Sequence, residues 1–186
     1  MTSDQLPAAV LAIDPGTERS AVVMYRPAEQ RFQWAEWMLN PDVLTMMRRY
    51  GREAGGLHVA IEDIQSFGLE VGRSTFETCV WIGRFAEAFE GAAPGRNQPA
   101  TMVSRRDVKI VLCGRMTYKD PRTGNQKKVG DSEVRRAVLG RFPATGGGST
   151  PQVGTKKQPG PCYCLRGDQG HKYQAAAIAV TYIETR

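Results

Sequence analysis

The stretch that decides the fold is Ala8–Asp14, AAVLAID, which is six apolar residues followed by an aspartate. Pro15 and Gly16 come directly after it, and such a pair is typical of a turn. A short apolar run that ends in a turn is typical of a strand buried on both faces. Burying a carboxylate there without a partner would be costly. We therefore predict a central strand that carries Asp14 to the edge of a sheet.

The segments that follow predict further strands and helices. Strand patterns cover Ser20–Arg26, Arg31–Trp37, Leu57–Glu62 and Ala100–Val103, and the first two form a hairpin. Predicted helices begin at Asn40-Pro41, at Thr75 after a capping box in Ser74–Glu77 (ending at about Glu90), and at caps Ser104 and Asp131, and an Ala-rich helix covers Tyr173–Ile183. A strand meander followed by strand–helix alternation implies an α/β fold, a mixed sheet with helices on both faces.

The composition excludes several classes of protein. The 186 residues suffice for one core, so we expect a single domain over residues 1–186. A hydrophobic share of 41% and a charged share of 24% exclude a disordered or fibrous chain. No run approaches the roughly 18–20 apolar residues that span a bilayer, and residues 1–7 show no secretory pattern, so we expect no membrane partner and a cytoplasmic location. Residues 144–170 are rich in Gly, Pro and Lys, which predicts a flexible loop.

Charge is concentrated in the second half of the chain. Residues 104–172 hold 15 Lys and Arg against 5 Asp and Glu, whereas the rest carries a net charge of −4. This asymmetry favours a polyanionic partner such as DNA, although a solvated basic surface would look the same. The candidate phosphate contacts are Arg73, Arg105, Arg106, Lys109, Arg115, Lys119, Lys127, Lys128, Arg135, Lys156 and Lys157, and Phe67 could stack on unpaired bases.

A second acid ends a second apolar strand. Glu62 follows Ala60 and Ile61 as Asp14 follows Ile13. Two carboxylates on neighbouring strands would repel each other unless a cation lay between them, and Mg²⁺ commonly takes one or two carboxylates. We expect Mg²⁺ as the cofactor, with Mn²⁺ able to substitute. In the alternative, Asp14 only caps its turn and Glu62 pairs with an arginine.

Five segments together resemble a known family: IDPGTERSAVVMY, VAIEDIQSFGLEVGRSTFETCVWIGRFAEAF, SRRDVKIVLCGRM, DSEVRRAVLGRF and GHKYQAAAIAVTYIET. They look like the RuvC-type Holliday-junction resolvases, especially their bacteriophage-type members. An Asp-x-Gly-Thr turn alone also occurs in sugar-kinase and actin-like ATPases, so the combination carries the resemblance. It implies a ribonuclease-H-like five-stranded mixed sheet and a Mg²⁺-dependent endonuclease. The enzyme would act as a homodimer on branched DNA, in a bacterial or phage-infected cytoplasm.

The resemblance also implies site residues. Asp14 and Glu62 match the first two metal-binding carboxylates, and His171 and Gln174 match the start of the family's final helix. His171 could orient or deprotonate the attacking water. Gln174 departs from the family's acid, and three accounts stay open. Gln174 could replace a native acid, Asp168 could supply the third acid, or the chain could be a non-catalytic binder of branched DNA.

Two further interpretations concern the helix predicted from Thr75 to about Glu90 and the last two cysteines. By analogy with the family, Phe76, Trp81 and Phe85 would supply a dimer face, although they could equally be core residues. Cys162 and Cys164, with His171, suggest zinc only weakly because a fourth soft ligand is missing nearby.

Overall fold

The computed structural model describes residues 6–53, 56–65, 71–92, 99–167 and 170–186. Its main sheet has five strands in the order β3-β2-β1-β4-β5. The elements are β1 (Ala9–Asp14), β2 (Arg19–Arg26), β3 (Arg31–Leu39), α1 (Asn40–Glu53), β4 (Leu57–Asp63), α2 (Arg73–Glu90), β5 (Thr101–Ser104), α3 (Arg105–Cys113), β6 (Thr117–Lys119), β7 (Gln126–Lys128), α4 (Asp131–Leu139), a short 3-10 turn (Tyr163–Leu165) and α5 (His171–Glu184). β1 pairs antiparallel with β2 and parallel with β4, so the sheet is mixed as predicted.

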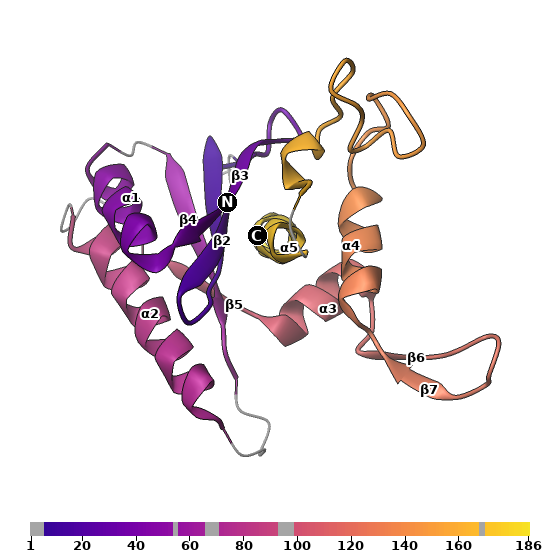
Figure 1. The fold of residues 1–186 in the computed structure, drawn as a ribbon, viewed down its shortest axis with the longest axis horizontal. Helices are drawn as coiled ribbons and strands as arrows, with labels where there is room; N and C mark the ends of the chain where they lie inside the picture. Colours follow the sequence, from indigo (N-terminus) through magenta and orange to yellow (C-terminus); the bar gives the residue numbers. More distant parts are fainter. Residues whose placement is uncertain (1–5, 54–55, 66–70, 93–98, 168–169) are drawn as a thin grey trace.

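Helices cover both faces of this sheet (Figure 1), with α1 and α2 on one face and α3, α4 and α5 on the other. The alternation of side chains along a strand assigns each residue of β1 to one face. Val10 and Ala12 belong to the core cluster that contains α5, whereas Leu11 and Ile13 belong to the cluster that contains α1 and α2. Asp14 follows in the same alternation and therefore faces α5.

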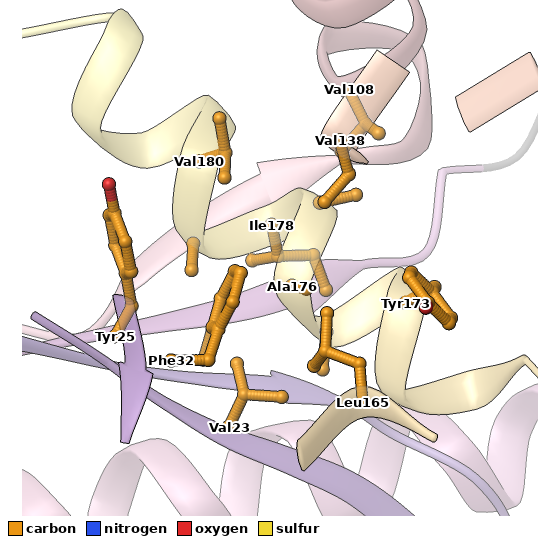
Figure 2. Packing of buried hydrophobic residues seen from close by; sticks show 14 of the residues in the cluster. Val23, Tyr25, Phe32, Val108, Val138, Leu165, Tyr173, Ala176, Ile178 and Val180 are labelled. Carbon is orange, nitrogen blue, oxygen red and sulfur yellow. The ribbon is translucent and has the colours of Figure 1, made fainter. Parts of the chain in front are cut away.

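Helix α5 is the most deeply buried helix of the described part of the chain. Its residues from Tyr173 to Tyr182 are all buried, between the sheet on one side and α3 and α4 on the other (Figure 2). Alanine side chains allow a helix to approach a sheet closely, which explains the Ala175–Ala177 run. None of the described helices combines the length and apolar character needed to cross a bilayer.

Two of the predicted helix starts are wrong and one is confirmed. Helix α2 begins at Arg73, and the Ser74 carbonyl already accepts a hydrogen bond from Thr78 inside the helix, so the predicted capping box does not form. Before α4, the Glu133 carboxylate accepts from the Gly130 amide, so Asp131 does not cap that helix. Ser104 does cap α3, because its hydroxyl oxygen accepts the Asp107 amide proton.

The described part of residues 144–170, expected to bury little, instead folds back on itself. The Gly160 amide donates to the Val153 carbonyl, and a Cβ on Gly154 would overlap the Gly160 amide nitrogen. Val153 and Leu165 are buried against the core. The segment lies beyond the C-terminal end of α4 (Figure 1).

The small antiparallel hairpin β6–β7 is an element that the sequence did not predict. It projects away from the main sheet (Figure 1). Most of its side chains are exposed and polar, so it lacks the alternation of apolar residues by which a strand is recognised.

Candidate active site

Asp14 and Glu62 lie side by side at one edge of the sheet. In the parallel pairing of β1 and β4, Ile13 is opposite Ile61, and each acid is the next residue of its strand. Both side chains face α5. Asp14 is 9% exposed, and the Glu62 side chain is 14% exposed and hydrogen-bonds with Asp14. The sequence-based expectation that two distant strands bring these acids together agrees with this geometry.

The environment of Glu62 favours its neutral form. Burial, followed by the hydrogen bond and the charge of Asp14, raises the pKa of Glu62 to about 8, and Arg105 offsets only part of this rise. At neutral pH the pair therefore holds a proton in place of a second negative charge. A divalent cation supplies the positive charge that would displace this proton.

Arg105 lies at the centre of a polar network. Its Nη1 is 3.5 Å from Glu62 Oε1 and also donates to Gln174 Oε1, and its Nη2 donates to Asp131 Oδ1. Arg105 was predicted from the sequence as one of the candidate phosphate contacts, and the structure places it in the cavity beside Asp14 and Glu62. One half of the alternative interpretation therefore holds, because Glu62 does have an arginine partner.

His171 lies against the other acid. Its Nδ1 is 3.4 Å from Asp14 Oδ2, and its ring stacks on Trp37 with 4.2 Å between centroids. The stacking fixes the plane of the imidazole, and the first turn of α5 fixes its position. His171 is therefore held where it can orient or accept a proton from a water molecule beside Asp14.

The turn after Asp14 is built by β2 and α1. The Ser20 hydroxyl donates to Asn40 Oδ1 (2.7 Å), and the Asn40 amide donates to the Gly16 carbonyl (3.0 Å). A Cβ on Gly16 would overlap the carbonyl oxygen of Arg19, so only glycine fits there. This buried network holds the end of β1, and with it Asp14, in one orientation.

A cavity of about 360 Å³ joins these groups. It is lined by Asp14, Glu62, Asp63, Ile64, Gln65, Arg105, Asp131, His171 and Gln174. Gln174 is 7% exposed and contributes no charge. Across the described ranges, three or more His, Cys, Asp or Glu groups do not come close enough together to form a metal cluster. The Asp14–Glu62 pair therefore matches the one or two carboxylates that Mg²⁺ commonly uses, with water and phosphate completing its shell.

The other predicted site residues divide into three groups. Phe67 and Asp168 lie outside the described residues. Arg73 is exposed, pairs with Glu77, and lies on α2, on the opposite side of the sheet from the cavity. The remaining basic candidates lie on α3, the loop between α3 and β6, the β6–β7 hairpin, α4 and the segment after α4. These are Arg106, Lys109, Arg115, Lys119, Lys127, Lys128, Arg135, Lys156 and Lys157.

Some of these basic side chains already have partners. Lys127 forms an ion pair with the buried Asp120. The Arg135 guanidinium lies 4.4 Å from the centroid of the Tyr173 ring. Such contacts fix the cations in place, and both residues remain exposed to solvent.

Asp131 lines the cavity and Trp37 stacks on His171, and neither was predicted from the sequence as a site residue. Asp131 was interpreted as a helix cap, but because Glu133 closes the start of α4, its carboxylate reaches Arg105 instead. Arg105 directly follows β5, and the parallel pairing of β1, β4 and β5 brings the ends of these strands, and Arg105 with them, to one edge of the sheet. Trp37 gave no signal that distinguished it from any other residue of β3.

The zinc alternative gains no support. Burial raises the pKa of the Cys162 thiol to about 12 and that of Cys164 to about 11, so both thiols stay protonated. The Cys164 thiol donates to the Phe32 carbonyl at 3.5 Å. His171, the third group of that interpretation, lies against Asp14 and Trp37.

Comparison with known proteins identifies the fold. No protein-family model matches the chain, and no curated protein matches it. Solved structures do match it, among them Thermus thermophilus RuvC in complex with a Holliday junction substrate and a structure of Thermus thermophilus RuvC. The first has a TM-score of 0.58 at 19% identity and covers 96% of this chain and 95% of that one. The second has a TM-score of 0.58 at 18% identity, covering 95% and 93%. The chain therefore has the RuvC-like, ribonuclease-H-like fold that its sequence predicted.

Proposed function

We propose that this protein is a Mg²⁺-dependent, structure-selective DNA endonuclease that resolves four-way and other branched junctions by paired nicks. The observation that carries the proposal is the buried Asp14–Glu62 pair at the carboxyl ends of two adjacent parallel strands. The matched fold adds support, because one neighbour was solved on a Holliday junction substrate.

Asp14 and Glu62 would hold the divalent ion, which supplies Lewis-acid activation of water and charge stabilisation at the phosphate. His171, 3.4 Å from Asp14, orients the attacking water and accepts its proton. Trp37 keeps the imidazole in the required plane. Arg105 faces the same cavity and supplies a fixed positive charge to the phosphate group.

Contact with DNA would come from the basic residues of α3, α4, the β6–β7 hairpin and the segment after α4. These elements lie on the α5 side of the sheet, as the cavity does (Figure 1). If about eight of these cations contact phosphates, affinity should fall with salt at a log–log slope near −7. Such contacts position the backbone without reading sequence, which suits selection of DNA by its shape.

Paired nicks require two active sites, and α2 offers a surface for a homodimer. Phe76 is 61% exposed and Val80 is 52% exposed, and both are large apolar side chains on one side of the helix. Phe85 of the same helix is fully buried in the core. The two interpretations of this helix, dimer face and core, therefore apply to different sides of it.

The test is nicking of a labelled four-way junction by the purified chain with Mg²⁺ or Mn²⁺, beside a linear duplex of the same sequence. We expect paired nicks in the junction, little cleavage of the duplex, and loss of nicking in Asp14→Asn. Cleavage of both substrates at equal rates would reject selectivity for structure. Junction binding without nicking would direct attention to the second candidate.

The second candidate is a non-catalytic binder of branched DNA, and the neutral Gln174 is the observation that favours it. Gln174→Glu and Gln174→Asp distinguish the two candidates. If the original chain and both variants bind the junction tightly and none nicks it, the binder is correct. If the original chain nicks, an acid at position 174 is not required.

A further inference from the structure

The cavity beside Asp14 and Glu62 already contains a fixed cation of its own. The Arg105 guanidinium contacts groups from three elements: Glu62 on β4, Gln174 on α5 and Asp131 on α4. Arg105 itself is the first residue of α3, directly after Ser104, whose side chain caps that helix. A guanidinium with this many partners, on a helix anchored at its start, has a defined position.

Gln174 occupies the position where a negatively charged side chain would be needed to bind a second metal ion. Two-metal nucleases hold their ions about 4 Å apart. A second ion beside Asp14 and Glu62 would need further anionic oxygen ligands. Here α5 contributes a neutral amide, and its oxygen is taken up by Arg105. Asp131 is also engaged by Arg105, on the side of the guanidinium away from Gln174. Asp63, which also lines the cavity, accepts a hydrogen bond from Gln65. Among the described acids of the lining, Asp14 and Glu62 are the two that contact each other.

We propose that Arg105 takes the place of a second divalent ion, so that each chain binds one catalytic metal ion at Asp14 and Glu62. Gln174 and Asp131 are then positioning residues that hold the guanidinium against the phosphate group. This inference rests on the proposed nuclease function and specifies its metal requirement.

The chemistry that this arrangement supports is ordinary phosphodiester hydrolysis. The water oxygen forms a bond to phosphorus and passes its proton to His171, while the bridging P–O bond breaks and its oxygen takes a proton from solvent. Arg105 donates to a non-bridging phosphate oxygen, and two parallel N–H groups suit that geometry. Lysine would keep the charge at position 105 without the paired donors.

The test counts metal ions. Mn²⁺ is titrated into the full chain and binding is followed by electron paramagnetic resonance and by calorimetry. We expect one site per chain in the original protein. In the double variant Arg105→Gln/Gln174→Glu, which removes the cation and supplies an acid, we expect two. Arg106→Gln removes a neighbouring exposed charge from the same helix and should leave the number of sites at one.

Kinetics supply a second readout. The nicking rate should depend on Mg²⁺ concentration with first order at low concentration. Arg105→Gln should lower kcat about 10²-fold, the usual effect of losing one preorganised donor to a transition state, and Arg105→Lys should restore part of it. A purely structural role for Arg105 would change stability without this recovery by lysine.

The possible outcomes are distinct. Two Mn²⁺ sites in the original chain, with second-order dependence on Mg²⁺, would overturn the one-ion inference and leave the nuclease proposal standing. Absence of any Mn²⁺ site together with absence of nicking would overturn both. One site in the original protein, whether or not the double variant folds, supports the inference.

Discussion

Helix α5 and strand β4 contact each other at two ends, and the polar residues at these two ends have different roles. At one end, His58 Nδ1 of β4 lies 2.5 Å from the Tyr182 hydroxyl of α5. At the other end, Glu62 of β4 faces Asp14, Arg105 and the first turn of α5. Both ends bury polar groups on one face of one sheet, but only the second end buries like charges together.

The difference shows which end is built for stability. Burial, followed by the charge of Arg186, lowers the pKa of His58, so its imidazole stays neutral at pH 7 and is satisfied by Tyr182. Burial, followed by the hydrogen bond and charge of Asp14, instead raises the pKa of Glu62. Perturbed pKa values of this kind cluster at functional sites, and the proposed divalent cation would compensate for the pair.

The largest expected effect comes from breaking the acidic end at Asp14. Asp14→Asn keeps the shape and removes the charge, so we expect nicking of a four-way junction to fall about 10³-fold, equivalent to several kcal/mol of lost metal-assisted stabilisation. Junction binding should persist. A variant that nicks at more than a tenth of the original rate would contradict the assignment of Asp14.

Next comes His171, which touches Asp14 from α5. His171→Gln should lower the nicking rate about 10²-fold, the low end of the range for general acid–base catalysis. The fall should be steepest at a pH where the original imidazole is neutral and able to accept a proton. An unchanged pH profile in this variant would show that His171 neither orients nor deprotonates the water.

A smaller effect, on stability, should follow from Glu62→Gln measured without divalent ions. The folded-state pKa of Glu62 is about 8, above its ordinary 4.5, so the original chain loses stability as pH rises between these values. Gln has no proton to lose. We expect the variant to be more stable than the original chain by several kcal/mol at pH 8.5 and almost equal to it at pH 4. Urea denaturation at both pH values measures this, and equal gains at both would contradict it.

The smallest effect should come from Tyr182, near the C-terminal end of α5. Tyr182→Phe removes the hydroxyl that meets His58, so we expect about 1 kcal/mol of lost stability. The nicking rate should be unchanged at a temperature well below unfolding. A loss of nicking at full stability would mean that the two ends are coupled along α5, and would contradict the separation of a structural end at Tyr182 from a catalytic end at Asp14.

Sequence patterns predicted most of the fold because its strands have strong apolar runs. β1, β2 and β4 were placed almost to the residue, and Asp14 and Glu62 followed as acids that end two such runs. The β6–β7 hairpin was not predicted, because it is too short and polar to show alternation. The starts of α2 and α4 were misplaced because several nearby residues could cap each helix, and tertiary contacts decide which one does.

By itself, the sequence determined the layered α/β architecture and the two acids at strand ends, since both follow from local periodicity and the cost of burying a lone carboxylate. Only the tertiary structure decided that Arg105 and Asp131 join them, because these residues come from different helices and nothing local in the sequence relates them. The same holds for Trp37 and His171, which are 134 positions apart in sequence and meet through ring stacking. The physical reason is long-range packing, which brings the ends of separate strands and helices together at one edge of the sheet.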